Sequence, residues 1–180
     1  MDSLQKLIDI EAIKQLKARY MRGVDTKDWE LLGSTFAPDA RSVYSGGKYS
    51  ILEGGTRTPF ITYWPGTIKK GVSDEMVCTI DLAASLAAYN KVKLPADACL
   101  DSFDVMGALL GKPGAKGRDH LIEQDNGRGG NYGFRVGNWK LQRHDSKKKR
   151  NAKLNLETKP APRIALFNLA EDVGEKKNVA

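Results

Sequence analysis

The sequence is poor in cysteine and histidine, with two of each among its 180 residues. Two cysteines build no disulfide framework, and the separation of Cys78 and Cys99 does not match the paired spacing of structural zinc ligands. We expect both to be small buried apolar side chains. The chain also lacks an apolar run long enough to cross a bilayer, and Met1 leads into an amphipathic segment instead of a secretion signal. These absences predict a cytoplasmic protein without a membrane partner.

Positive charge is in excess but is not arranged as in nucleic-acid-binding proteins. The formal net charge is +7 and the sequence pI is about 9.4. Much of the excess lies in the run from Lys147 to Arg150, which has no interleaved aromatic side chains on which bases could stack. We therefore expect a solvated loop there and no nucleic-acid partner.

The first 45 residues have the periodicity of a helical pair. Apolar residues recur about every 3.6 positions from residue 3 to about 24, which predicts an amphipathic helix. Asp25 and Thr26 are candidate caps for a shorter second helix that carries Trp29. A brief strand is expected around residues 41–44.

The remainder predicts an α+β fold that ends in an antiparallel sheet. We expect a short strand at 60–64, a helix over 74–90 capped by Ser73, and a short helix at 105–112. Four strands separated by turns rich in Gly and Asn are expected at 120–124, 131–137, 138–144 and 164–169.

A glycine-rich stretch, "SGGKYSILEGGTRTPF" at 45–60, places one lysine, Lys48, in a loop ahead of an apolar run. Glycines adopt backbone conformations with positive φ that other residues avoid, so they suit tight turns and close backbone approach. The stretch fits a surface turn with a solvated lysine, and it also fits an anion-contacting lysine held at the mouth of a site.

Residues 46–180 resemble the sulfatase family. The passage "GKYSILEGGTRTPFITYWPG" has that family's lysine, acidic-Gly-Gly and Trp-Pro-Gly elements, followed by a helix with a mid-helix Asp81. The ending "LFNLAEDVGEKKNVA" resembles the family's DxGExxN ending. The resemblance implies a closing antiparallel sheet with packed helices, and it places Lys48 on the lysine that contacts the substrate's sulfate.

The resemblance also implies catalytic parts that this sequence lacks. Sulfatases use a formylglycine made within a Cys/Ser-x-Pro-x-Arg motif, together with calcium held by carboxylates and Asn. No such motif occurs in this sequence. Asp125 and Asn126 imitate the family's later metal pair but follow the lysine motif instead of preceding it, so we expect a turn there. We expect no metal site and no cofactor in these 180 residues.

Residues 8–50 resemble the SnoaL-like family, which includes scytalone and bile-acid dehydratases. In the dehydratase members, a tyrosine on the first helix and an aspartate five residues later line the pocket, which implies Tyr20 and Asp25 here. The residues alone also fit a second interpretation, in which the tyrosine packs against a neighbouring helix and the aspartate is an N-cap. A dehydration needs a proton-exchanging group such as histidine. His120 and His144 lie instead in the sulfatase-like part, where we expect structural or surface roles.

Both families carry a "GGKYS"-like string, so residues 46–50 are the predicted junction of a chimera with domains 1–45 and 46–180. A natural fusion, an assembly artefact and a computed sequence would each have this pattern. The predicted function is a sulfatase carboxy-terminal portion without catalysis of its own, which contacts sulfate esters or other anions. The alternatives are a small dehydratase or isomerase and a non-enzymatic anion- or partner-binding module. The apolar stripe of the first helix predicts self-association.

Overall fold

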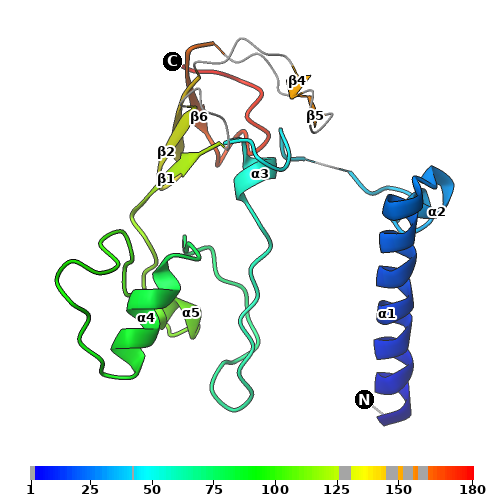
Figure 1. Cartoon of the computed structure of the whole chain (residues 1–180), viewed down its shortest axis with the longest axis horizontal. Helices are drawn as coiled ribbons and strands as arrows, with labels where there is room; N and C mark the ends of the chain where they lie inside the picture. Colours follow the sequence, from blue (N-terminus) through cyan, green and yellow to red (C-terminus); the bar gives the residue numbers. More distant parts are fainter. Residues whose placement is uncertain (1–2, 42, 126–130, 145–149, 152–155, 158–161) are drawn as a thin grey trace. The chain divides into compact units, whose positions relative to one another are not determined.

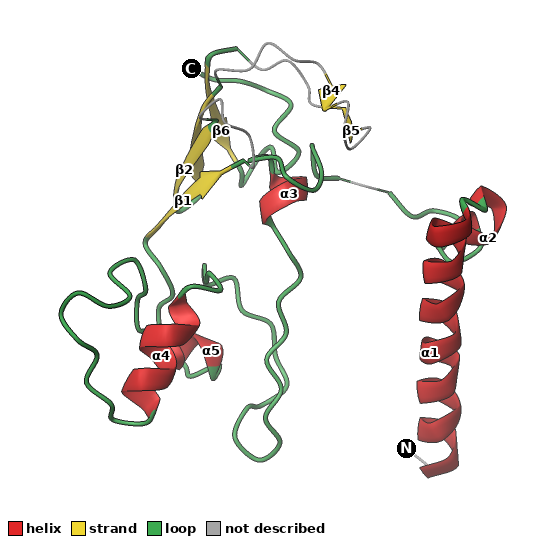
Figure 2. Cartoon of the chain, in the orientation of Figure 1, coloured by secondary structure: helices red, strands yellow, loops and turns green. Residues whose placement is uncertain are grey.

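A computed structural model describes all residues except 1–2, 42, 126–130, 145–149, 152–155 and 158–161. The chain divides into two compact units, residues 1–42 and 43–180. Their helices and strands are shown along the chain in Figure 1 and by type in Figure 2.

The first unit is a helical pair, α1 (Ser3–Thr26) and α2 (Trp29–Gly33). The predicted first helix is confirmed. The predicted caps are wrong, because Asp25 and Thr26 belong to the last turn of α1, while the Asp28 side chain accepts a hydrogen bond from the Leu31 amide at 2.9 Å. A side-chain acceptor at this position satisfies an amide that has no partner within the helix.

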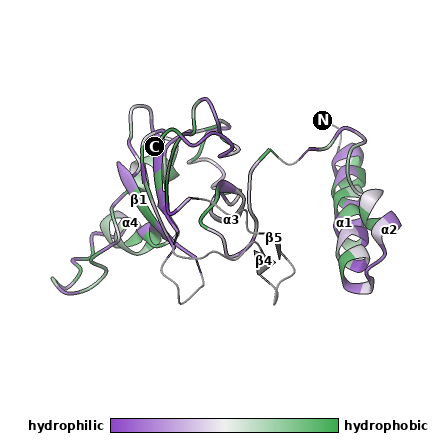
Figure 3. Cartoon of the chain, turned by 90° about the horizontal axis from the view of Figure 1, so that it is seen from above, coloured by the Kyte–Doolittle hydropathy of each residue, from purple (hydrophilic) through white to green (hydrophobic). Residues whose placement is uncertain are grey.

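The two helices meet at a glycine. Gly23 is the one described residue of α1 that is buried, and a Cβ atom there would lie 2.9 Å from the backbone nitrogen of Leu32. Tyr20 packs edge-on against Phe36, with ring centroids 6.1 Å apart. The ribbon of α1 in Figure 3 carries hydrophobic and hydrophilic colours in alternation, and its apolar side chains remain largely exposed, as at Leu7 and Ile13.

The second unit contains a four-stranded antiparallel sheet in the order β1-β2-β3-β6, as predicted. The strands are β1 (His120–Gln124), β2 (Tyr132–Val136), β3 (Trp139–Arg143) and β6 (Ile164–Asn168). A separate two-stranded ladder, β4 (Arg150–Asn151) with β5 (Leu156–Glu157), was not predicted.

The faces of this sheet differ from the usual arrangement, since charged side chains such as Lys140 and Glu123 are buried and most of its large apolar ones are exposed. The buried face carries Lys140 and Gln142, which are both 0% exposed. The opposite face carries seven apolar side chains that are 42–67% exposed: Ile122, Tyr132, Phe134, Val136, Trp139, Leu141 and Ile164. The register aligns Ile122, Phe134, Leu141 and Leu166 in one row across the strands. A small apolar cluster of Ala165, Phe167 and Leu169 lies on the buried side.

Three short helices precede the sheet: α3 (Glu53–Thr56), α4 (Asp81–Tyr89) and α5 (Met106–Leu109). The helix predicted over 74–90 therefore begins seven residues late, and Asp81 is its first residue instead of a mid-helix one. Helices α4 and α5 pack on each other. The Ser85 hydroxyl on α4 accepts a hydrogen bond from the Val105 amide, which precedes α5, at 3.0 Å.

Two predicted strands are absent from the described residues. Residues 60–64 form an irregular extended segment with no strand partner, and residues 41, 43 and 44 form no strand either. The expectation that both cysteines are buried is also wrong, since Cys99 is exposed and Cys78 is partly exposed.

Candidate functional site

The candidate site is the loop that carries Lys48, residues 45–55, called the lysine loop below. The Gly54 amide donates to the Ser45 carbonyl at 2.8 Å, which closes the loop at its base. Within it, the Ser50 amide donates to the Gly47 carbonyl at 3.0 Å. The Lys48 side chain is exposed, and its amine lies 5.0 Å from the centroid of the adjacent Tyr49 ring. The loop thus holds a closed backbone and presents a cation to solvent.

Glycines permit this closed backbone. Gly46 has a φ of +75°, which side chains disfavour. A Cβ atom at Gly54 would lie 2.7 Å from the Ser45 carbonyl oxygen, and one at Gly55 would lie 2.3 Å from the Ser50 carbonyl oxygen. Any side chain at these two positions would collide with backbone, so the two glycines of the acidic-Gly-Gly sequence are required by the shape of the loop.

Below the loop lies a buried charge cluster of Glu53, Glu123, Lys140 and Glu175. The Lys140 amine lies 2.8 Å from Glu53 Oε1, 2.9 Å from Glu123 Oε2 and 3.3 Å from Glu175 Oε1. A buried ammonium group needs such partners, because removing a charge from water is costly unless it is paired and hydrogen-bonded. The cluster joins α3, two strands and the carboxy-terminal segment at one amine.

Two arginines bring further positive charge to this cluster. Arg57 Nη1 lies 3.4 Å and Arg135 Nη1 3.6 Å from Glu53 Oε2. Gly133, opposite Glu123 in the β1–β2 ladder, leaves room for the Glu123 carboxylate, since a Cβ atom there would lie 2.8 Å from its Oε2. The contact of that oxygen with Lys140 is an ion pair, because no donor among the described residues points at it with hydrogen-bond geometry.

Burial and charge pairing shift the pKa values in the cluster in opposite directions. Burial raises the pKa of Glu123 and of Glu175, and Lys140 offsets only part of that rise. Burial disfavours the charge of Lys140, but the three surrounding carboxylates outweigh it and raise the pKa of its amine. The amine therefore stays protonated at neutral pH.

The carboxy-terminal residues 172–178, called the C-terminal turn below, reach the lysine loop. Glu175 Oε2 accepts a hydrogen bond from the Glu53 amide at 2.6 Å, and the Gly174 carbonyl accepts one from the Ser45 hydroxyl. Asp172 shapes this turn by accepting from the Lys176 and Lys177 amides, both at 2.7 Å. These residues belong to the "DxGExxN" ending recognised in the sequence, which has a structural role here.

Asp81 and Arg118 form a second buried ion pair, which holds α4 to the segments around it. Arg118 Nε lies 2.9 and 2.8 Å from the two Asp81 oxygens, and its guanidinium lies 4.2 Å from the centroid of the Phe103 ring. Asp81 also accepts from the Cys78 and Phe103 amides. Burial opposes the charge of Asp81, but the hydrogen bonds from Arg118 and from these amides lower its pKa.

The predicted site residues do not gather at one place. Tyr20 and Asp25 are in α1 of the first unit, where Tyr20 packs on Phe36 and Asp25 is exposed. In the second unit, His120 contacts the neighbouring Asp119 at 2.7 Å. The His144 ring contacts Gln142 Oε1 at 2.9 Å, and burial lowers its pKa.

The carboxylates of the described residues do not fit a divalent cation. Asp81 and the charge-cluster carboxylates already face Arg118 and Lys140, and among the described residues no three His, Cys, Asp or Glu side chains could hold a metal ion. Asp125 accepts from Asn131 Nδ2 at 2.5 Å, while Asn126 lies outside the described residues. The basic run at 147–149 also lies outside them. Among the described residues, these carboxylates therefore do not fit calcium, the cation that the sulfatase resemblance implies.

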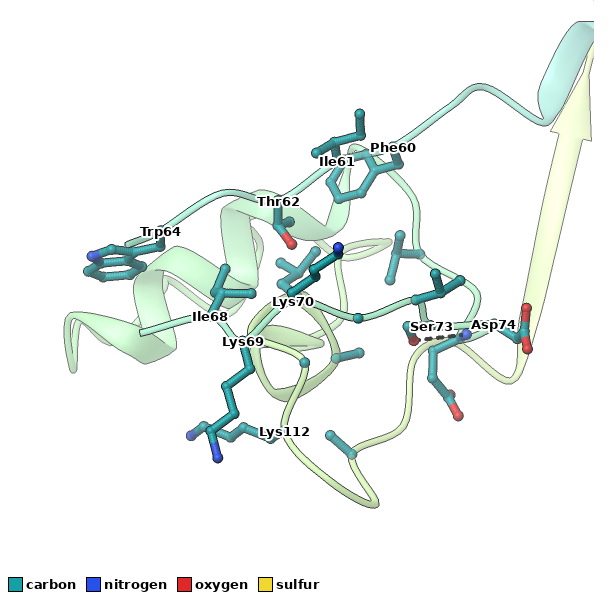
Figure 4. A pocket seen from close by; sticks show the side chains of 18 of the residues that line it. Phe60, Ile61, Thr62, Trp64, Ile68, Lys69, Lys70, Ser73, Asp74 and Lys112 are labelled. Carbon is teal, nitrogen blue, oxygen red and sulfur yellow. Dashed lines mark hydrogen bonds between the residues drawn. The ribbon is translucent and has the colours of Figure 1, made fainter. Parts of the chain in front are cut away.

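A cavity of about 1110 Å³ lies elsewhere in the second unit, shown in Figure 4. Phe60, Ile61, Thr62 and Trp64 follow one another along one of its walls, and Ile68, Lys69 and Lys70 along another. Trp64 packs edge-on against Tyr89 at 5.4 Å between ring centroids. This lining could contact an apolar ring that bears an anionic group.

Lys140 and Glu175 are the residues that sequence reasoning missed. In "WKLQR" apolar and polar side chains alternate, and the polar pair Lys140 and Gln142 is the set that faces the core. Glu175 is the acidic residue of the recognised "DxGExxN" ending, but nothing in the sequence shows that it is buried beside Lys140.

Comparison with known proteins finds both resemblances. A family model described as a SnoaL-like domain matches residues 5–68, which extends past the predicted junction at 46–50. An N-acetylgalactosamine-6-O-sulfatase of Bacteroides thetaiotaomicron is 36% identical over 138 residues, 77% of this chain and 26% of that protein. An arylsulfatase of Hemicentrotus pulcherrimus is 42% identical over 69 residues, 38% of this chain and 12% of that protein.

A solved sulfatase structure from Bacteroides thetaiotaomicron agrees with these matches. That structure is described by the metabolism of multiple glycosaminoglycans in its organism. The match has a TM-score of 0.70 at 33% identity and covers 84% of this chain and 30% of that one. The chain thus spans about a quarter of the length of the first of these curated relatives and less of the second. The described residues include no helix that is long and apolar enough to cross a membrane.

Proposed function

From this chain's similarity to part of a sulfatase, preceded by a SnoaL-like start, we propose that it binds sulfate esters through Lys48 and does not hydrolyse them by itself. The observation that carries the proposal is the lysine loop, whose closed backbone exposes one ammonium group. Such a group is a compact point charge that can contact sulfate oxygens. The relatives' names suggest a sulfated amino sugar or an aryl sulfate as the ligand.

The absence of hydrolysis follows from the chemistry that a sulfate ester requires. Positioning a bound ester accelerates a reaction only when a nucleophile is held against it. The sequence contains no Cys/Ser-x-Pro-x-Arg motif from which a formylglycine could be made, and the buried carboxylates of Asp81 and Glu53 are paired with Arg118 and Lys140. Binding without turnover is therefore the expected behaviour.

The binding test compares Lys48→Ala with Lys93→Ala, which removes the same charge from another exposed position. We expect N-acetylgalactosamine 6-sulfate, titrated calorimetrically at low salt, to bind several-fold more weakly to Lys48→Ala, because exposed charge pairs contribute up to about 1 kcal/mol. Lys93→Ala should bind like the parent chain. Equal affinity of all three proteins would contradict the proposal, and a loss with Lys70→Ala instead would place the anion in the cavity of Figure 4.

The turnover test uses the full chain with calcium, an aryl sulfate and a formylglycine-generating enzyme. We expect phenol release no faster than with Lys48→Ala. Release that depends on Lys48 would overturn the absence of hydrolysis, since it requires a nucleophile and a metal site that these residues do not supply.

A dehydratase or isomerase is the second candidate, favoured by the SnoaL-like match over residues 5–68. It assigns Tyr20 and Asp25 to a pocket that acts on a hydroxylated ring compound. Turnover of such a compound, lost in Tyr20→Phe or Asp25→Asn, would support this candidate over anion binding alone. The same substitutions should leave sulfate-ester affinity unchanged.

A further inference from the structure

We propose that the C-terminal turn sets the conformation of the lysine loop and thereby the anion affinity of Lys48. Glu175 is then a positioning residue that acts through Glu53. The effect on affinity depends on the proposed function, whereas the effect on loop conformation does not.

Two hydrogen bonds join segments of the chain that are far apart in the sequence. The Glu53 amide donates to Glu175 Oε2 at 2.6 Å, across 122 residues of sequence. The Ser45 hydroxyl donates to the Gly174 carbonyl, across 129 residues. Ser45 and Glu53 lie at opposite ends of the lysine loop, so the C-terminal turn holds the loop at both ends.

The turn is itself fixed on the sheet. The Asn178 side chain accepts from the Leu166 amide of β6 at 2.8 Å, and the Val179 amide donates to the Leu166 carbonyl at 2.9 Å. Glu175 has a φ of +50°, in the left-handed region that non-glycine residues rarely adopt. Backbone strain of this kind persists only where the surroundings determine it; here Lys140 contacts Glu175, and Asp172 accepts a hydrogen bond from the Lys176 amide within the turn.

Both oxygens of the Glu175 carboxylate have polar partners. Its Oε1 accepts from Gln142 Nε2 and lies 3.3 Å from Lys140 Nζ, while Oε2 accepts from the Glu53 amide. Lys140 in turn holds the side chain of the same Glu53 at 2.8 Å. Glu53 is therefore bound at its amide and at its carboxylate, which leaves the first residue of α3 little freedom.

Close packing completes the contact. A Cβ atom at Gly174 would lie 2.8 Å from the Val43 carbonyl oxygen, so backbone meets backbone there. Ile51 and Leu52 within the loop are also buried, at 1% and 7% exposure. Lys48 is exposed at the far end of a loop that is fixed at its base.

The experiment measures hydrogen exchange of the Glu53 and Gly54 amides together with sulfate-ester affinity in the full chain. We expect Glu175→Ala to speed exchange at these amides by about tenfold or more, because one buried hydrogen bond is lost and its donor is left unpaired. Sulfate-ester affinity should fall several-fold. Glu175→Gln retains an amide oxygen that can accept from Glu53, so it should recover part of both losses.

Two further variants keep the test decisive if Glu175→Ala does not fold. Ser45→Ala removes the other tether and should speed exchange at Gly54 while amides of β2 and β3 stay protected. Glu171→Gln, an exposed carboxylate four residues before Glu175, is the matched control and should change neither measurement. Unchanged exchange at Glu53 and Gly54 in every folded variant of Glu175 and Ser45 would overturn the proposal.

The two proposals fail in different ways. If Lys48→Ala leaves affinity unchanged but Glu175→Gln speeds loop exchange, anion binding at Lys48 is refuted and the control of loop conformation stands. If Lys48→Ala weakens binding but neither tether affects exchange or affinity, the loop holds its shape alone and the control by the C-terminal turn is refuted.

Discussion

Lys140 is a fully buried lysine on which three carboxylates converge. We predict that Lys140→Met lowers the free energy of unfolding by about 3–5 kcal/mol, because removing one partner leaves the others as uncompensated buried charges. Urea denaturation followed by tryptophan fluorescence measures it. Lys93→Met, at an exposed position, should stay within about 0.5 kcal/mol of the parent. Equal midpoints for the two variants would show that the buried charges are compensated in another way.

The raised pKa of Glu123 predicts a pH dependence of stability. Above the ordinary carboxyl pKa of 4.5 and up to the raised one, the folded chain holds more protons than the unfolded chain, so the free energy of unfolding falls as pH rises. Glu123→Gln does not titrate and should make this fall smaller between pH 4.5 and 7. Urea midpoints across this range test it, with Glu171→Gln as the control. A slope that is unchanged from the parent would contradict the burial effect at Glu123.

The exposed apolar face of the four-stranded sheet makes a prediction at the scale of the element. An exposed apolar patch over several strands favours association and dye binding. We expect Phe134→Ser or Leu141→Ser, in the central strands, to reduce the fluorescence of a hydrophobic dye. Ile61→Ser, at a residue 88% exposed on an irregular segment, should reduce it less. If all three variants bind dye equally, the face is not the dye's site.

Turn signals made the strands predictable. Gly and Asn residues lie in the turns that join β1, β2 and β3, and the structure places β1, β2, β3 and β6 within the predicted ranges. The helix over 74–90 was overpredicted because the apolar stripe does not reveal competing partners. The Met76 carbonyl accepts from the Arg118 amide, and the Cys78 amide donates to the Asp81 side chain, so the helix begins only at Asp81.

The position of the buried charges was less predictable. Which face of β3 is buried depends on Glu53 and Glu175, which lie far away in the sequence and supply the partners of Lys140. Residues 60–64 have strand composition but no partner strand, and composition alone does not reveal that. Lys48 was identified by resemblance, while its support by the C-terminal turn required the structure.

At the scale of the whole molecule, the question is whether the predicted domains 1–45 and 46–180 fold independently or share a core. We predict that limited proteolysis first cuts between the helical pair and the lysine loop and leaves a stable fragment that begins near Lys48. The hydrogen bonds between the lysine loop and the C-terminal turn should protect that fragment. Mass spectrometry identifies the cut. A protease-resistant full chain would instead show that the two predicted domains share a core.

We also propose that copies of the chain associate with one another through the exposed apolar residues of α1. We expect the elution volume in size-exclusion chromatography to depend on concentration, and Leu7→Lys with Ile13→Lys to remove that dependence, since both side chains are more than 60% exposed. A monomer at all concentrations in the parent chain would contradict this expectation.

The tethers at Ser45 and Glu53 also affect the order of events during synthesis. Translation adds about 5–20 residues per second, so the 122 residues between Glu53 and Glu175 take roughly 6–24 s to make. During that time the lysine loop has already been synthesised, but Gly174 and Glu175, the partners that fix it, have not. The lysine loop is therefore among the first parts of the second unit to be synthesised and among the last to acquire its final conformation.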